Sequence, residues 1–252
     1  MAVSVAASGA GRPQGDGPGG GVRRWLNAPS LAWEFLRRNT EYHADFARWR
    51  QERRSPLASI DPRWGLRFAA DPNLTAEEAK VFWLPEVAPG LVVWLRREEA
   101  DGSPGQGRLL PSGQTRRARD GLHLRTAWGL QALIDSDGRG GEPLIVALTY
   151  DEHLRLRVRA VDAFERLAAG RPPPKSHLTS AQILRLHRCL EAVDGALAGR
   201  SYRAIAQTIF GASAVASAPW KISSARATTI RLVRAGRALI DGGYLKLLHG
   251  GL

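Results

Sequence analysis

The chain has 252 residues, of which 44% are apolar, so it can form two modest domains with cores of their own. A net charge of +12 and a pI near 11.0 favour a polyanionic partner. The single cysteine, Cys189, excludes an internal disulfide and a multi-cysteine metal site, and no apolar run approaches the roughly 18 residues of a membrane span.

The first residues are rich in Gly and Pro and contain little to bury. We therefore expect residues 1–24 to form a disordered leader. The opening MAVSVAASGAG lacks the basic region of a secretory signal, so the sequence predicts a cytoplasmic protein.

The first strong helical pattern is SLAWEFLRRNTEYHADFARWRQER, with Ser30 as the expected cap and a break around Asn39–Thr40. Its aromatic residues recur at helical spacing. Such a stripe is more often core than a surface for base stacking.

The next segments predict a small sheet. Turn signals precede a capping-box pattern at Thr75–Glu78, and residues 91–95 read as a buried strand. Residues 100–121 form a polar loop in this interpretation. Two β-type segments follow, joined at residues 136–142 by a hairpin-like connection.

From residue 151 the pattern is helical again, with an expected buried stripe of Leu154, Val158, Val161, Phe164 and Leu167. We therefore predict an α+β domain with a small sheet at residues 25–169, ending in a helix. Residues 170–176, with Pro172, Pro173 and Pro174, form a predicted stiff hinge.

The last part, residues 177–252, predicts a three-helix domain of the helix-turn-helix type, so that the whole chain is α+β and predominantly helical. Thr179 and Gln182 suggest a capping box for the supporting helix. Ser201 caps the second helix, which ends at Gly211. Ser223 or Ser224 caps the third, which closes at Gly242–Gly243, and Trp220 is expected to be buried in the turn between them.

On a helical wheel, the third helix separates an apolar face from a cationic one. Cations beside small residues suit a helix that must lie close to phosphates and base edges. The candidate DNA-binding residues are Ser223, Ser224, Arg226, Ala227, Thr228, Arg231, Arg234 and Arg237.

Codon bias is the alternative explanation of the charge, because 32 of the 36 basic residues are Arg. Its distribution argues against codon bias alone. Residues 175–252 hold 11 Lys and Arg against 3 Asp and Glu, a net charge of +8. The alternative interpretation of the cationic face of the third helix is a basic surface that contacts only solvent and not DNA.

Catalytic signatures are absent from the sequence: it has no Walker loop, HExxH or CxxC, and its six histidines lack ligand spacing. Tyr244 follows an Arg-rich helix, as a recombinase nucleophile would. However, Gly242-Gly243-Tyr244-Leu245 is more typical of a helix stop followed by a hydrophobic contact. We therefore predict no enzyme activity, no catalytic residue, no metal site and no cofactor.

Two sets of motifs resemble known domains. The segments AWEFLRRNTEYHADFARW, WGLRFAADP and VFWLPE resemble the transcriptional-regulator-like N-terminal domain common in alphaproteobacteria. The segments SYRAIAQTIFG, APWK and TIRLVRAGRALIDGGY resemble the uncharacterised C-terminal domain usually paired with it. Together, over residues 30–250 apart from 100–121, they resemble the excision activators of rhizobial integrative and conjugative elements.

This resemblance implies a sequence-specific DNA-binding transcriptional regulator that activates genes for excision or transfer of a mobile element. The expected partners are double-stranded DNA and, as further candidates, another transcription regulator or RNA polymerase. The family also contains short single-domain antiactivators. The alternative hypothesis is therefore a protein-binding modulator of another regulator. The basic third helix and the two-domain length favour DNA binding.

Overall fold

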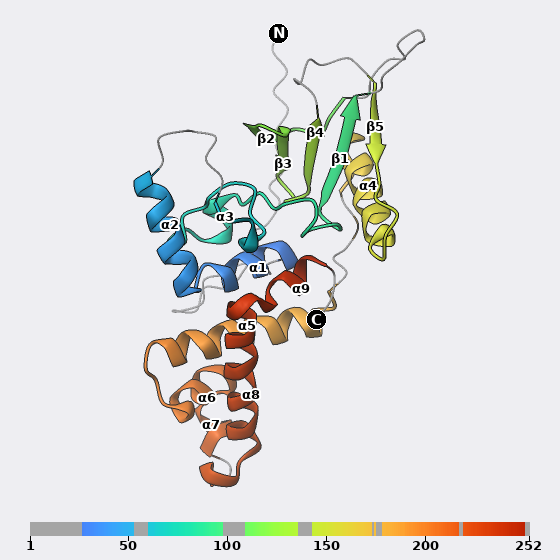
Figure 1. Cartoon of the computed structure of the whole chain (residues 1–252). Coiled ribbons are helices and arrows are strands. Elements are labelled where there is room, and N and C mark those ends of the chain that lie inside the picture. The colour runs from blue at the N-terminus through green and yellow to red at the C-terminus, as the bar shows by residue number, and fades with distance from the viewer. Residues whose placement is uncertain are drawn as a thin grey trace, which may run out of the picture.

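The computed structural model describes residues 27–52, 60–97, 109–135, 143–172, 174, 178–216 and 219–249. Within these ranges the chain is α+β. A five-stranded sheet with surrounding helices forms the first part, and helices alone form the last part (Figure 1). The predicted leader and the connection at 136–142 lie outside the described residues.

The strands are β1 (Val92–Arg97), β2 (Gly113–Ala118), β3 (Gly121–Thr126), β4 (Gln131–Asp135) and β5 (Leu144–Ala147). The α-helices are α1 (Ala28–Leu36), α2 (Thr40–Glu52), α3 (Ala76–Ala79), α4 (Leu154–Ala168), α5 (Ser180–Leu197), α6 (Tyr202–Phe210), α7 (Ala212–Ala216), α8 (Ser224–Ala238) and α9 (Leu245–Leu248). The short 3-10 helices are η1 (Pro62–Trp64) and η2 (Trp220–Ile222), and η3 (Leu239–Gly243) is a π-helical turn.

Helix α1 begins earlier than the sequence predicts. Its N-cap is Asn27 rather than Ser30, because the Ser30 N–H donates to Oδ1 of Asn27 at 3.0 Å. Pro29 fits the first turn, where a backbone N–H has no partner within the helix. Ser30 is therefore a first-turn residue and not the cap.

The predicted break around Asn39–Thr40 is confirmed, because residues 37–39 separate α1 from α2. Trp33 and Tyr42 are fully buried, and their ring centroids lie 5.8 Å apart in an edge-to-face arrangement. Tyr42 also contacts the ring of Trp64 edge-on at 5.5 Å. The interpretation as core is therefore confirmed for Trp33 and Tyr42, whereas Phe46 and Trp49 of the same stripe are half-buried.

The strand order is β2-β3-β4-β1-β5, which corrects the predicted hairpin. β1 pairs in parallel with β4 and antiparallel with β5, so β1 separates the two segments that the sequence appeared to join. A turn-like sequence indicates that the chain reverses direction, but it does not show which strands pair with one another. The largely apolar β1, with Val93 and Leu95 buried, takes an inner position.

Part of the expected loop at residues 100–121 is a strand. β2 pairs antiparallel with β3 at the edge of the sheet. Its residues GQTRRA are polar or small and mostly exposed. An edge strand of this kind lacks the alternation of apolar and polar residues on which strand prediction depends, so the sequence analysis missed it.

Two further segments pack against the sheet. Helix α4 contacts β1 and buries Ala160, Ala163 and Phe164, but Val158 is 50% exposed, which corrects its place in the predicted stripe. The irregular segment before β1 is tied to β4 by the buried side chain of Gln131. This amide donates to the Val81 carbonyl at 2.9 Å and accepts from the Trp83 N–H at 2.9 Å.

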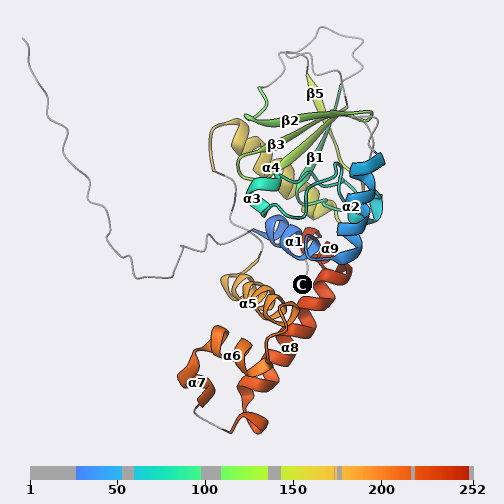
Figure 2. The ribbon, with the colours of Figure 1, turned by 90° about the vertical axis from the view of Figure 1, so that its left-hand side faces the viewer.

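The C-terminal end of the chain packs into the first part of the molecule. Both views show α9 beside α1, while α6, α7 and the first turns of α8 lie away from the sheet (Figures 1 and 2). The Tyr244 ring is 1% exposed and lies 6.4 Å from the Trp83 ring, and its hydroxyl donates to the Trp64 carbonyl at 3.1 Å. Asn39 Nδ2 donates to the Ile240 carbonyl at 3.0 Å.

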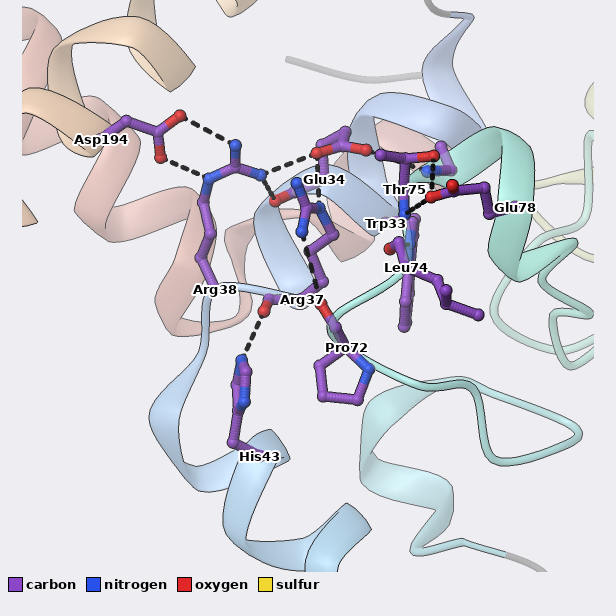
Figure 3. Close-up of polar contacts among 11 residues, drawn as sticks. Trp33, Glu34, Arg37, Arg38, His43, Pro72, Leu74, Thr75, Glu78 and Asp194 are labelled. Carbon is purple, nitrogen blue, oxygen red and sulfur yellow. Dashed lines mark hydrogen bonds and ion pairs between the residues drawn. The ribbon is translucent and has the colours of Figure 1, made fainter.

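An ion-pair network also joins the two parts (Figure 3). The Arg38 guanidinium binds Asp194 of α5 through two nitrogen–oxygen contacts, at 2.5 and 2.8 Å, and Glu34 of α1 at 2.8 Å. Burial opposes ionisation of Glu34. The hydrogen bonds from Arg38 and Arg37 outweigh that effect and hold the pKa of Glu34 below its usual value.

The domain limits at 25–169 and 177–252 remain a prediction. Residues 171, 172 and 174 of the expected hinge are exposed, and residues 173 and 175–177 lie outside the described ranges. The contacts of Asn39 and Tyr244 nevertheless show that residues 178–249 share buried surface with the first part.

The first prediction concerns Tyr244. Tyr244→Ala should lower the free energy of unfolding by about 3–5 kcal/mol, because it empties a site filled by a buried aromatic ring. Chemical denaturation measures this loss. The matched control is Tyr150→Ala: Tyr150 is 92% exposed, so this change should stay within about 0.5 kcal/mol of the wild type. Equal losses for the two variants would show that Tyr244 does not join the two parts.

A second prediction concerns His123, which is 2% exposed and lies edge-on to Phe68 at 5.2 Å. Burial lowers the pKa of His123 from its ordinary 6.5, against the opposing effect of the hydrogen bond that its ring donates to the Asp120 carboxylate. Because the unfolded chain binds this proton more readily, the free energy of unfolding should fall as the pH drops below 6.5. The pKa of Asp120 lies below 3.8, so Asp120 stays charged until the solution is much more acidic.

Denaturation of the wild type and of His123→Gln, compared across this pH range, measures the effect. The variant should lose less stability than the wild type on acidification. An unchanged pH dependence would exclude His123 as its source.

Candidate nucleic-acid interface

Helix α6 forms where the sequence predicts it. The Ser201 hydroxyl caps the helix by accepting the Ala204 N–H at 3.2 Å, and Gly211 ends it at φ 89°, in the region that favours glycine. Ile205 and Ala206 are buried. α6 packs against both α5 and α8, so these three helices contact one another.

Helix α8 is capped by Ser223, whose Oγ accepts the Arg226 N–H at 3.2 Å. Its inner face buries Thr229, Leu232, Val233 and Gly236. This face is the apolar one that the helical wheel predicts.

Gly236 permits a close approach of α8 to α5. A Cβ atom at this position would lie 2.8 Å from the Cys189 carbonyl oxygen and 2.9 Å from Cβ of Val193. A Cβ atom does not approach other heavy atoms this closely. Glycine at position 236 is therefore what allows α8 to pack so near α5. Cys189 itself is buried and burial raises the pKa of its thiol. Cys189 is therefore a small core residue between these helices.

The outer face of α8 carries the predicted DNA-binding side chains. Exposed residues are Ser224, Arg226, Ala227, Arg231, Arg234 and Arg237, whereas Ser223 and Thr228 are half-buried. Arg231 Nη2 donates to the Thr228 hydroxyl at 3.1 Å. In the described part of the chain, these four arginines form no ion pair. The structure thus brings all eight residues to one helix and its cap.

Further exposed cations of this part of the chain were not among the predicted DNA-binding residues. Lys221 lies in η2, immediately before the cap of α8, and Arg203 lies in the first turn of α6. The sequence could have indicated both residues, because each stands within three residues of a serine that caps a helix. A cation beside the N-terminus of an outward-facing helix is well placed for phosphate contact.

The three acidic residues of this region lie outside α8. Glu191 and Asp194 belong to α5, and Asp194 is paired with Arg38, which follows α1. Asp241 follows α8 in the π-helical turn. The arginines of α8 therefore face solvent, while Asp194 is engaged with the first part of the molecule.

The connection between α6 and α8 is longer than the three or four residues of a tight helix-turn-helix. Residues 211–223 contain α7 and η2, and residues 217–218 lie outside the described ranges. Trp220 is half-buried and not fully buried as expected, whereas Val215 of α7 is 1% exposed. Val215 rather than Trp220 is thus the buried apolar residue of this connection.

The surroundings of Tyr244 do not suit a nucleophile. Its hydroxyl is a hydrogen-bond donor to a backbone carbonyl, and burial raises the pKa of the phenol. No group of His, Cys, Asp and Glu side chains suited to a metal ion occurs in the described ranges. In the same ranges, every helix is too short or too polar to cross a membrane.

Comparison with known proteins finds two family matches. Residues 22–69 match the proteobacterial transcriptional regulator-like domain, in the region that suggested such a domain from its sequence. Residues 147–249 match a family described as T6SS, Transcription factor, DNA binding domain, and this range contains α4 to α9. No curated protein matches the chain. Both families are of regulatory or DNA-binding type and neither is enzymatic, so the matches support a DNA-binding transcriptional regulator.

Proposed function

We propose that this protein is a sequence-specific DNA-binding transcriptional regulator and that α8 is its recognition helix. The observation that carries the proposal is the difference between the two faces of α8. One side packs on α5 through Gly236, and the other presents four arginines without an acidic partner in the described part of the chain. The match of residues 147–249 to a DNA-binding family supports the same role.

The size of α8 suits the major groove. Its 15 residues span about 22 Å along the axis, and a major groove about 12 Å wide admits a single helix. Ala227 has a small side chain on the exposed face, which allows the helix to approach base edges closely. We propose that α6 and α8, with α5 behind them, act as a helix-turn-helix unit with an extended turn.

Within this unit, the N-terminal part of a recognition helix approaches the bases. Ser224, Ala227, Thr228 and Arg231 then contact base edges. Arg234 and Arg237 lie further along and contact phosphates. Ser223 and Arg226 complete the surface at the start of the helix.

The regulated genes are a further part of the proposal. The motifs in residues 30–250 resemble excision activators of rhizobial integrative and conjugative elements, so we propose activation of genes for excision or transfer of a mobile element. Another regulator or RNA polymerase is the proposed protein partner at the promoter. Cytoplasmic location follows from this role.

The third prediction separates base reading from phosphate contact. Arg231→Ala should lose about 1–3 kcal/mol on the cognate site and relax the preference at one base pair, as expected for a bidentate arginine–guanine contact. Arg234→Ala should weaken all DNA sequences equally and lower the slope of log K against log salt by about 1. Fluorescence anisotropy with the protein's own upstream region, at several salt concentrations, measures both effects.

The control is Arg159→Ala, which removes an exposed arginine of α4, outside the proposed interface. It should change neither specificity nor the salt slope. If a folded Arg231/Arg234 double alanine variant binds DNA as tightly as the wild type, the DNA-reading proposal is wrong. The protein-binding modulator is then the better hypothesis.

A further inference from the structure

The first part of the molecule contains a cavity that the proposed DNA-binding function does not use. It has a volume of about 680 Å³, within the range of small-molecule sites. It opens between the end of β3, the start of α1 and the residues after α3. Its principal polar and aromatic lining residues are Lys80, Ser112, Gln114, Arg125 and Trp128.

Arg125 is the feature that points to a ligand. Its side chain is only partly exposed, and in the described part of the chain it forms neither a hydrogen bond nor an ion pair. Burial alone lowers the pKa of its guanidinium. Removing a cation from water without a counter-ion is unfavourable, so the arrangement is complete only when an anion enters.

Trp128 supplies an apolar surface beside this cation. Its side chain is 59% exposed although its backbone belongs to a tight turn, closed by the Gly129 N–H donating to the Thr126 carbonyl at 2.9 Å. Gly129 has φ +85°, and a Cβ atom built on it would lie 4.0 Å from Nη2 of Arg125. The guanidinium therefore lies next to the turn that carries the indole.

The indole also lines a second cavity of about 280 Å³, next to residues 167 and 170–172. An aromatic residue with open space beside it on a rigid turn is suited to stacking with a flat apolar group.

The remaining charges favour an anion. Lys80 is exposed at the edge of the cavity and has φ +47°, a left-handed conformation that disfavours any residue other than glycine. Glu77 is the one carboxylate among the described lining residues, against two cations. Gln114 and Ser112 add polar groups that can orient a carboxylate.

Another cavity of similar size lacks this combination of a half-buried cation and an exposed aromatic ring. It has a volume of about 720 Å³, again in the range of ligand sites, and lies between α1 and α5. Its charged residues Glu34, Arg38 and Asp194 already bind one another. Arg200 also lines this cavity but is exposed to solvent, so its charge needs no counter-ion, in contrast to the half-buried Arg125.

We propose that the cavity beside Arg125 and Trp128 binds a small organic anion with a flat apolar portion, such as an aromatic carboxylate. Arg125 binds the carboxylate, Trp128 stacks on the ring, and Lys80 adds positive charge at the entrance. This site is separate from α8 and does not depend on the DNA-binding proposal.

Calorimetric titration of the full-length protein, without DNA, tests the site. The probes are benzoate, naphthalene-2-carboxylate and indole-3-acetate, each compared with its uncharged carboxamide. At least one carboxylate should bind saturably, one per chain, with a Kd of about 1 mM or tighter. Its carboxamide should bind about tenfold more weakly, because the charge-assisted contact to the guanidinium is lost.

Variants locate the binding. Arg125→Gln should weaken the carboxylate about tenfold, and Arg125→Lys should recover part of that loss. Trp128→Ala should weaken the naphthyl probe more than benzoate, because the larger ring loses more stacking area. The matched control is Arg159→Gln, an equal loss of charge on α4, which should leave affinity unchanged.

Three results would overturn the proposal. They are no saturable binding of any carboxylate, equal binding of the carboxylates and carboxamides, and unchanged affinity in an Arg125→Gln variant whose circular dichroism and melting match the wild type. Because DNA is absent from the titration, a failure here is distinct from a failure of the DNA-binding proposal.

Discussion

Helix α1 is the structural element on which the rest of the molecule depends, because both parts of the chain bury surface against it. Seven of its nine residues are buried, including Trp33 and Glu34. α3 contacts it from the first part, and α5, α9 and the π-helical turn contact it from the last. A buried carboxylate such as Glu34 is tolerated only when fully paired. Arg38 pairs it, and the same guanidinium holds Asp194 of α5. The guanidinium that compensates the buried charge of Glu34 thus also joins the first part of the molecule to the last.

The last part of the chain is fixed to α1 by its geometry after α8. Gly242 has φ +109°, and a Cβ atom on Gly243 would lie 2.6 Å from the Ala238 carbonyl oxygen. Only glycines allow this turn. It directs Tyr244 against the ring of Trp83 and the backbone carbonyl of Trp64. The glycine-glycine-tyrosine sequence, which could suggest a catalytic tyrosine, is therefore explained by packing. It also sets the orientation of α8 relative to the first part.

Local signals predicted the helices well, and long-range pairing was not predictable from them. Capping residues such as Thr179, Ser201 and Ser223 act within three residues of themselves, so their sequence patterns are sufficient. The position of β1 between β4 and β5 depends on contacts between residues about 40 to 50 positions apart. No turn signal contains that information. β2 was missed for a related reason, since an exposed edge strand has no apolar face to reveal it.

The candidate interface was predictable to the extent that it is a property of one helix. A wheel assigns Thr229 and Gly236 to the inside and Arg231 and Arg234 to the outside, and burial agrees. Pairing could not be predicted, because an arginine face is available for DNA only when no carboxylate neutralises it. That condition depends on where the carboxylates of the last part lie in the fold, which a helical wheel does not show. Asp194 lies on α5 and binds Arg38 of the first part, whereas the arginines of α8 form no ion pair within the described residues. The wheel therefore predicts which residues of α8 face outward, but whether their charges are compensated follows only from the three-dimensional arrangement of α5 and α8.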